Sequence, residues 1–286
     1  MTLRSIVWLV ALSVGFCILS LFFSHYTWLI PWVQIGVATL LCATTFRTLR
    51  ATAARPTEGR FADRDLPSVT IAIPARNETK DLEECLRTVL ASDYPKLEVI
   101  VLDDCSQLPT ADVVKGFAQQ GVRFIPGKPP AKRWLAKNQA YQKLYNEASG
   151  DIILFCGVDI RFGVSAVRET VYQMLERHKR MVSVLPVRQH ASLQDSYIQP
   201  IRYWWELVLP RKFFNRPAVL STCWAIYHED IHALGSFKAT SRSVMPEQYF
   251  ARELVRKDAY SFLRSSASLD VATVKSLEEQ RRTALR

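Results

Sequence analysis

Two long stretches without a charged side chain, residues 5–23 and 27–46, constrain this chain more than any other feature of its sequence. Each is about 20 residues long, the length that a helix needs to cross the ~30 Å hydrocarbon core of a membrane. Only Ser24, His25 and Tyr26 separate them, so the pattern predicts a transmembrane helical hairpin. A signal peptide or two buried core helices are the alternatives, but the second apolar run follows at once and no small-residue cleavage site precedes it.

Basic residues around the two stretches predict the orientation of the hairpin. Arg4 precedes the first stretch, and the turn between the stretches holds no Lys or Arg. Four arginines follow the second stretch, namely Arg47, Arg50, Arg55 and Arg60. The positive-inside rule then places both ends of the hairpin in the cytoplasm. We therefore expect a protein of the inner membrane whose remaining residues lie on the cytoplasmic side.

The sequence carries a formal net charge of +10, from 37 Lys and Arg against 27 Asp and Glu. An anionic membrane surface explains this excess, because the arginines directly follow a predicted spanning stretch. An anionic substrate such as a sugar nucleotide would also benefit from the positive field. Nucleic acid is not expected as a partner, because the sequence shows no recognition motif of a nucleic-acid-binding module.

From residue 66 the pattern changes to short apolar strands that alternate with helices. Strands are predicted at 68–74, 97–102, 122–125 and 152–156, and helices at 81–91, 111–119 and 137–148. Such alternation predicts an α/β domain with a mostly parallel sheet covered by helices on both faces. The expected organisation is a two-helix anchor over 1–47, a basic juxtamembrane linker over 48–65 and this domain over 66–286.

Polar residues stand just past the ends of the predicted strands, where parallel sheets bind their ligands. They are Arg76, Asn77 and Glu78, then Asp103 and Asp104, and then Asp159. One carboxylate can accept a hydrogen bond from a base or ribose, and another can hold Mg²⁺ or Mn²⁺ against a diphosphate. Taken singly, each of these residues is better explained as an ordinary loop acid or helix N-cap.

Six segments together resemble the family 2 glycosyltransferases. They are V-T-I-A-I-P-A-R-N-E (69–78), L-R-T-V-L-A-S-D-Y-P (86–95), E-V-I-V-L-D-D-C-S (98–106), W-L-A-K-N (134–138), G-D-I-I-L-F-C-G-V-D-I-R-F (150–162) and P-E-Q-Y-F (246–250). The resemblance is closest to membrane-bound members, the ceramide-glucosyltransferase-like and hopanoid- or carotenoid-associated branches. It implies a GT-A fold and an inverting transfer of sugar from a nucleotide diphosphate, with UDP expected, to a lipid hydroxyl.

The resemblance also implies roles for individual residues. Four would line the nucleotide pocket: Pro74, Ala75, Arg76 and Glu78. Asp104 would hydrogen-bond the base with Asp103 beside it, and Lys137 would lie near the diphosphate. Asp159 would hold the metal, Mg²⁺ or Mn²⁺. Glu247 and Gln248 occupy the position of the catalytic base, which takes the proton of the acceptor hydroxyl.

The sequence departs from the family pattern at three places. Gly157 replaces the first Asp of the metal-binding D-x-D motif. Gln248 replaces the Asp that usually acts as the catalytic base, and an amide accepts no proton at neutral pH. The acceptor motif Q-x-x-R-W, expected near 280–288, is represented only by Gln280 and the arginines after it. These departures motivate the alternative of a degenerate or non-catalytic homologue that keeps the fold. A nucleotidyltransferase is less favoured, because no Gly-rich phosphate loop follows the first strand.

Residues 197–214 mix aromatic with basic side chains. Such a mixture is typical of a helix that lies in the headgroup region of a membrane, and it would suit the entry of a lipid acceptor. Packing of Trp204 and Trp205 against the sheet is the alternative interpretation.

Overall fold

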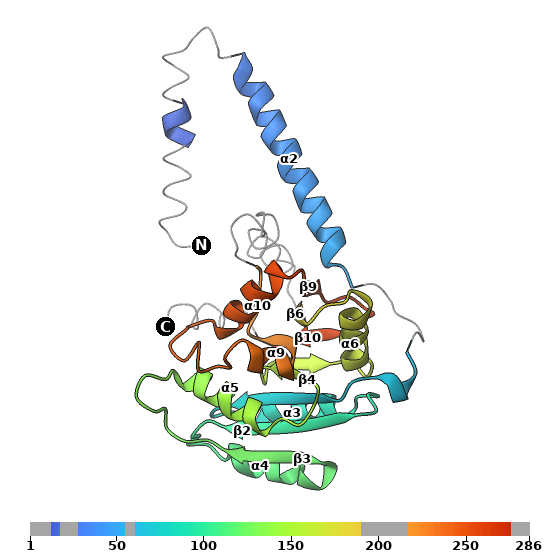
Figure 1. Ribbon diagram of the computed structural model, residues 1–286, viewed down its shortest axis with the longest axis vertical. Coiled ribbons are helices and arrows are strands. Elements are labelled where there is room, and N and C mark those ends of the chain that lie inside the picture. The colour runs from blue at the N-terminus through green and yellow to red at the C-terminus, as the bar shows by residue number, and fades with distance from the viewer. Residues whose placement is uncertain (1–12, 18–27, 55–60, 190–216, 276–286) are drawn as a thin grey trace. The chain divides into compact units, whose positions relative to one another are not determined.

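The computed structural model describes residues 13–17, 28–54, 61–189 and 217–275 (Figure 1). The chain divides into two compact units, residues 1–50 and 51–286. Helix α2, Leu29–Thr52, is the one helix in the described ranges that is long and apolar enough to cross a membrane, and none of its apolar window is buried. Of the predicted first helix only residues 13–17 are described, and they are helical. The predicted first helix and the turn after it therefore lie largely outside the described residues, and the hairpin is not confirmed.

Helix α2 continues past the uncharged stretch that ends at residue 46. Leu49, Arg50 and Ala51 favour helix, which explains why α2 reaches into the predicted linker. Within the second unit, the end of this segment is bonded to the α/β fold. The Arg177 guanidinium donates to the carbonyls of Ala51 and Ala53 at 3.0 and 2.7 Å.

A seven-stranded sheet forms the centre of the second unit, with strand order β3-β2-β1-β4-β8-β6-β9. The strands are β1 Val69–Ala75, β2 Leu97–Asp103, β3 Val122–Pro126, β4 Ile152–Cys156, β6 Met181–Leu185, β8 Cys223–Tyr227 and β9 Tyr260–Arg264. All run in one direction except β8, which pairs antiparallel with β4 and β6. The predicted mostly parallel sheet is thus confirmed, and both ends of each strand from β1 to β4 lie within one residue of the expected range.

The α-helices of the second unit are α3 Lys80–Leu90, α4 Thr110–Gly116, α5 Ala136–Glu147, α6 Ala166–Glu176, α9 His228–Ala233 and α10 Pro246–Arg256. Two 3-10 turns, η2 Asp63–Asp65 and η3 Ala118–Gln120, complete the set. The predicted helix over 111–119 is thus shorter and ends in η3. Chain order and right-handed crossovers place α3 and α4 on one face of the sheet and α5 on the other.

Alternate residues of the strands pack against these two layers. Ile71 and Ile73 of β1 belong to the aliphatic cluster that includes Leu82 and Leu86 of α3. The opposite face is aromatic, and Phe155 of β4 lies at its centre.

The ring of Phe155 stacks on Trp224 of β8 with centroids 4.4 Å apart. It also contacts Tyr141 of α5 at 4.9 Å. The ring of Phe250 of α10 also stacks on Trp224, with the centroids 6.3 Å apart. This aromatic layer fixes α5 and α10 over the same face of the sheet, which matters for the site described below.

A second, three-stranded sheet has the order β5-β10-β7. Its strands are β5 Ile160–Phe162, β7 Val187–Arg188 and β10 Val271–Thr273. β10 pairs antiparallel with β5, so that Thr273 lies opposite Ile160. The predicted interfacial segment 197–214 and the region around Gln280 lie outside the described residues.

Candidate functional site

The carboxyl edge of the large sheet gathers the side chains that the sequence singles out. Strands β1, β2 and β4 are parallel neighbours, so Arg76, Asp104 and Asp159 follow strands that end at the same edge. Helices α5 and α10 run back toward the starts of β4 and β9, which puts their first turns at this edge as well. Those turns carry Lys137 and Glu247.

The loops after β1 and β2 are bonded to each other. Asn77 donates its backbone N–H to the Ser106 hydroxyl at 2.8 Å, and its side-chain oxygen accepts from the N–H of Gln107 at 2.7 Å. Asp103 accepts from the N–H of Ser106 at 3.2 Å. Asn77 has a φ of 56°, a left-handed conformation that Asn tolerates better than most residues. The predicted nucleotide-binding loops therefore form one connected unit.

Asp104 is the shielded acid of this unit. Its side chain is mostly buried, and Arg76 lies 3.8 Å away in an exposed position. Burial raises the pKa of the Asp104 carboxyl above its ordinary value, Asp103 adds to the increase, and Arg76 opposes it. The backbone N–H of Asp104 donates to the carbonyl of Ala75 at 2.8 Å. Ala75 itself is buried at the end of β1, Pro74 is half-buried within it, and Glu78 is half-buried in the loop.

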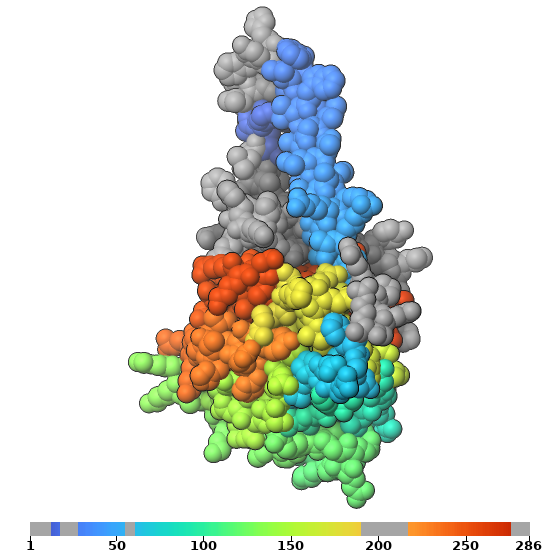
Figure 2. Space-filling model, turned by 45° about the vertical axis from the view of Figure 1, so that its right-hand side comes forward, coloured from blue at the N-terminus to red at the C-terminus, as the bar shows by residue number. Residues whose placement is uncertain are grey.

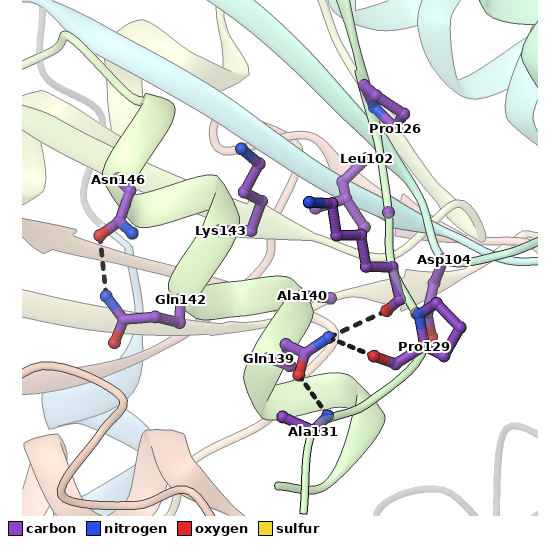
Figure 3. A pocket seen from close by; sticks show the side chains of 12 residues that line it. Leu102, Asp104, Pro126, Pro129, Ala131, Gln139, Ala140, Gln142, Lys143 and Asn146 are labelled. Carbon is purple, nitrogen blue, oxygen red and sulfur yellow. Dashed lines mark hydrogen bonds between the residues drawn. The ribbon is translucent and has the colours of Figure 1, made fainter.

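A cavity of about 390 Å³ opens beside Asp104, between the end of β2, the loop after β3 and one face of α5 (Figure 3). Gln139 of α5 shapes it by holding the loop. Its oxygen accepts from the N–H of Ala131 at 2.7 Å, and its nitrogen donates to the carbonyls of Lys128 and Pro129 at 2.9 and 3.1 Å. Gly127 is required at the loop start, because a Cβ there would collide with the carbonyl of Asp103. The cavity is of a size that suits a small ligand.

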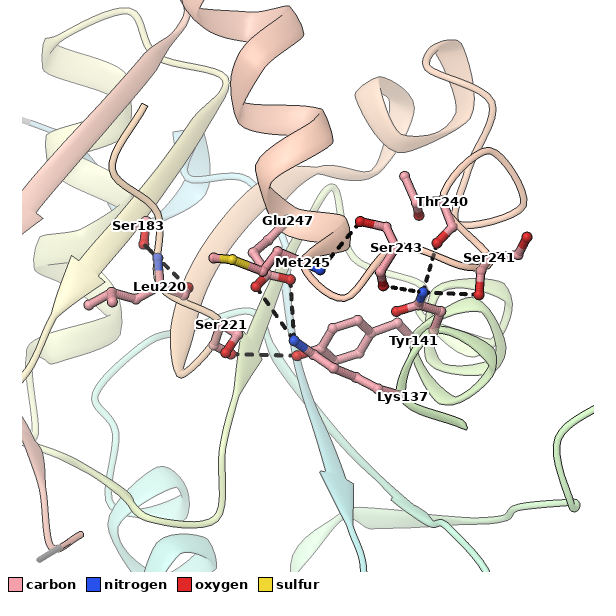
Figure 4. Close-up of polar contacts among 11 residues, drawn as sticks. Lys137, Tyr141, Ser183, Leu220, Ser221, Thr240, Ser241, Ser243, Met245 and Glu247 are labelled. Carbon is pink, nitrogen blue, oxygen red and sulfur yellow. Dashed lines mark hydrogen bonds and ion pairs between the residues drawn. The ribbon is translucent and has the colours of Figure 1, made fainter. Parts of the chain in front are cut away.

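Lys137 and Glu247 form an ion pair across the edge (Figure 4). The Lys137 Nζ lies 3.3 Å from Oε2 and 3.5 Å from Oε1 of Glu247. Glu247 is fully buried, whereas 37% of the Lys137 side chain is exposed. The ammonium also lies 5.3 Å from the ring centroid of Tyr141. Burial and the charge of Glu247 raise the pKa of the Tyr141 phenol, so this ring stays neutral.

Asn138, next to Lys137, fixes the loop that leads to Glu247. Its fully buried side-chain nitrogen donates to the carbonyls of Thr240, Ser241 and Ser243 at 2.7, 3.1 and 2.8 Å. Sequence reasoning missed Asn138 and Gln139 as contributors to the site. Their place directly after Lys137 was the available signal, but their partners lie in loops whose approach to α5 no local pattern encodes.

Asp159 lies between β4 and β5 and is held by the last strand of the small sheet. Its Oδ2 accepts from the hydroxyl of Thr273 at 3.0 Å, and its carbonyl accepts from the N–H of Val274 at 3.0 Å. A Cβ added at Gly157 would lie 2.5 Å from Oδ1 of Asp159. The lack of a side chain at Gly157 therefore leaves room for the Asp159 carboxylate to lie next to the backbone of residue 157. No pattern in the sequence indicated that Thr273 belongs to the site.

A divalent metal would find one protein carboxylate here. The described residues contain no cluster of three or more His, Cys, Asp or Glu side chains suited to a metal ion. Among the same residues, Oδ1 of Asp159 has no hydrogen-bond partner, since only Oδ2 receives the Thr273 hydroxyl. Mg²⁺ is commonly bound through one or two carboxylates with substrate phosphates and water. The donor set thus fits a metal that arrives with a phosphorylated ligand.

Gln248 follows Glu247 in the first turn of α10 and is half-buried. Its backbone N–H donates to the carbonyl of Met245 at 3.1 Å. The two residues of the predicted base position therefore differ in setting, since only Glu247 contacts Lys137.

The family model of glycosyl transferase family 2 matches residues 70–235, and the chain belongs to this family. The match spans the strands β1 to β8 and the acids at their ends. It confirms the resemblance seen in the sequence.

Two curated relatives match shorter segments. The probable glycosyltransferase YdaM of Bacillus subtilis is 32% identical over 100 residues, 34% of this chain and 24% of the relative. The 4,4'-diaponeurosporenoate glycosyltransferase of Staphylococcus aureus is 31% identical over 122 residues, 42% of this chain and 32% of the relative. The matched segments thus span about a quarter to a third of these relatives.

Two solved structures show the same fold. The mannosyltransferase PcManGT from Pyrobaculum calidifontis, in complex with GDP-Man and Mn²⁺, has a TM-score of 0.61 at 18% identity, covering 88% of this chain and 69% of that one. Residues 1–349 of TarS from S. aureus, in complex with UDP-GlcNAc, give 0.51 at 14% identity, covering 73% and 59%. At these identities the likeness concerns the fold, and it confirms the predicted GT-A class.

Proposed function

We propose that this protein transfers a sugar from a nucleotide diphosphate donor to a hydroxyl group of a membrane lipid. The observation that carries the proposal is the Lys137–Glu247 pair at the edge where Asp104 and Asp159 also stand, in a chain of glycosyl transferase family 2. Sugar transfer needs a base for the acceptor hydroxyl and positive charge for the leaving diphosphate. This edge offers both within one ion pair.

The donor would bind along the loops after β1 and β2. Asp104 accepts a hydrogen bond from the base, beside Asp103, in a pocket lined by Pro74, Ala75, Arg76 and Glu78. Lys137 lies near the diphosphate, and the first turns of α5 and α10 add the positive ends of two helix dipoles. Asp159 would hold Mg²⁺ or Mn²⁺, and the bound metal would supply further charge for the leaving phosphate.

Glu247 is the proposed base. When the diphosphate attracts the Lys137 ammonium, a carboxylate oxygen of Glu247 becomes available to the acceptor. The acceptor hydroxyl gives its proton to Glu247, its oxygen bonds to the anomeric carbon, and the nucleoside diphosphate leaves with the electrons of the broken bond. Gln248 accepts no proton at neutral pH, so its part is limited to hydrogen bonding.

Three observations support a lipid acceptor and a membrane location. Helix α2 has the length and composition of a spanning helix. The arginines around the apolar stretches favour a cytoplasmic domain. The S. aureus relative is named as a glycosyltransferase of 4,4'-diaponeurosporenoate. UDP is our first choice of donor, and GDP is the competitor because the PcManGT complex contains GDP-Man.

Gly157 and Gln248 favour a second candidate, a homologue that binds nucleotide without turnover. Introducing Gly157→Asp together with Gln248→Asp separates the two. Turnover that appears only in this double variant identifies a degenerate enzyme. An active enzyme gains little, because a Cβ at residue 157 would crowd Oδ1 of Asp159.

Titration calorimetry of the detergent-solubilised full-length protein tests the proposal. UDP and GDP are titrated with and without Mn²⁺, and Asp159→Ala serves as the control. Metal-dependent binding that Asp159→Ala abolishes supports a working donor site. Binding of neither nucleotide would overturn the proposed function.

A further inference from the structure

Two loops beside the candidate site share one surface. The first, residues 127–135, connects β3 to α5, and the second, residues 236–245, connects α9 to α10. The N–H of Leu135 donates to the carbonyl of Ser241 at 2.9 Å, which joins the loops directly. Figures 1 and 2 show them side by side, the first in green and the second in orange.

Both loops are fixed to the same helix. Consecutive residues of α5 hold them, Asn138 through three carbonyls of the second loop and Gln139 through the backbone of the first. The surface that they form is therefore built into the fold. We call it the loop platform.

The loop platform carries unbalanced positive charge. Neither loop contains an Asp or a Glu, and five exposed cations lie on them: Lys128, Lys132, Arg133, Lys238 and Arg242. Within the described ranges, none of the five forms an ion pair. Exposed cations elsewhere do so, as with Arg87 and Glu83 at 2.7 Å or Lys143 and Glu147 at 2.9 Å.

The same platform exposes apolar side chains. Val244 is 80% exposed, more than any other large apolar residue that the structure describes, and Leu135 and Met245 are 41% and 38% exposed. Three exposed apolar side chains among five cations form an amphipathic surface, and no ion pair within the described ranges neutralises its charge.

We propose that the loop platform is a membrane-contacting surface that seats on a bilayer rich in anionic headgroups, separately from α2. Lipid phosphates lie in a plane above apolar chains, so one bilayer satisfies both the cations and the side chains of Val244, Met245 and Leu135. A single-stranded nucleic acid fits less well, because it needs exposed aromatic rings for stacking. The two aromatic residues of the loops, Trp134 and Phe237, are half-buried and buried.

The proposal rests on the membrane association in the proposed function and not on sugar transfer. Seating the platform on the bilayer would bring the Lys137–Glu247 pair close to the headgroup layer, because Met245 stands two residues before Glu247.

Depth-dependent quenching tests the platform in the full-length chain. Cys17, Cys42 and Cys105 are exposed and are changed to Ser, while Cys85, Cys156 and Cys223 are buried. A Val244→Cys variant is then labelled with an NBD fluorophore and placed in nanodiscs that contain brominated lipid. A Val164→Cys variant, labelled at an exposed apolar position outside the platform, is the matched control. A third variant keeps Cys42 of α2 as the anchor probe.

We expect phosphatidylglycerol to increase quenching at position 244 several-fold over phosphatidylcholine alone. The double variant Lys238→Glu with Arg242→Glu should return the quenching at position 244 to its level in phosphatidylcholine alone. Quenching at position 164 should not depend on phosphatidylglycerol. Quenching at Cys42 without a response at position 244 would overturn the platform and leave the anchor intact. A spectral change at 244 with an oligonucleotide but not with anionic lipid would overturn it too. Titration of UDP with Mn²⁺ in the same nanodiscs reports on the proposed function separately.

Discussion

The Nζ of Lys137 lies 3.3 Å from Oε2 of Glu247, a residue 110 positions later in the chain. The contact joins the first turn of α5 to the first turn of α10. Because Glu247 is fully buried, the Lys137 ammonium takes the place of the water that would solvate a surface carboxylate. The pair therefore links the stability of the edge to the chemistry proposed for it.

Removal of Lys137 should destabilise the fold. Breaking a buried pair costs about 3–5 kcal/mol, and since Lys137 is partly exposed we expect about 2 kcal/mol for Lys137→Ala. The measurement is thermal unfolding in detergent. Lys143→Ala is the matched control on the same helix, because its exposed pair with Glu147 is worth below about 0.5 kcal/mol. Equal shifts of Tm in the two variants would contradict the role of the buried pair.

Glu247→Gln should remove the base while leaving donor binding. General base catalysis contributes about 10²- to 10⁴-fold, so we expect a loss of transfer in that range with unchanged affinity for UDP. Gln248→Ala should change the rate by no more than a few-fold. The reverse ranking of the two variants would exclude Glu247 as the base.

Thr273→Val should weaken the metal-dependent part of nucleotide binding. The Thr273 hydroxyl orients Asp159 at 3.0 Å, and loss of such an outer contact typically costs about 10- to 100-fold in metal affinity. Calorimetry with Mn²⁺ and UDP measures the change. Thr170→Val serves as control, because its buried hydroxyl bonds only within α6, to the carbonyl of Ala166 at 2.8 Å. Undiminished Mn²⁺ affinity in Thr273→Val would show that Asp159 is oriented by other means.

Gly157→Ala should displace the carboxylate of Asp159. The new Cβ would lie 2.5 Å from Oδ1, so the side chain must turn away and Mn²⁺-dependent binding of UDP should fall. Gly116→Ala is the control, since a Cβ there meets nothing within 4 Å. If both variants bind UDP and Mn²⁺ as the wild type does, Asp159 takes no part in metal binding.

Acidification should weaken nucleotide binding, and the midpoint of this loss should lie at a higher pH than the pKa of an ordinary Asp would give. The pKa of Asp104 is raised, by burial foremost, and the binding form is the carboxylate, which is lost as pH falls through that pKa. For folding the sign is opposite: the native state holds this proton more tightly than the unfolded chain, so protonation stabilises the fold. Arg76→Ala should move the binding midpoint to higher pH, whereas Arg76→Lys keeps the charge and should not. Identical midpoints in wild type and Arg76→Ala would contradict this.

Strands β1 to β4 were predictable because each is a short apolar run bounded by a turn residue. β8 was not recognised. Its sequence, Cys223-Trp-Ala-Ile-Tyr, is apolar enough for a strand, but its antiparallel direction depends on contacts with β4 and β6 that no local pattern encodes.

In the candidate site, too, local sequence patterns pointed to some residues, while others depend on contacts between distant parts of the chain. Asp104, Asp159, Lys137 and Glu247 were identified through motifs that sit at element ends. Thr273 escaped because it reaches Asp159 from 114 positions away, and a lone Thr in a short strand has no distinguishing neighbours.

The bond between Thr273 and Asp159 also sets an order of events during synthesis. Asp159 is translated long before the strand that orients it, and β10 pairs with β5 only once residues 271–273 have left the ribosome. The loops proposed to bind the nucleotide can assemble earlier, because the strands that carry them are adjacent in the chain. A nascent chain would thus form the proposed base-recognition pocket first and orient the proposed metal ligand last.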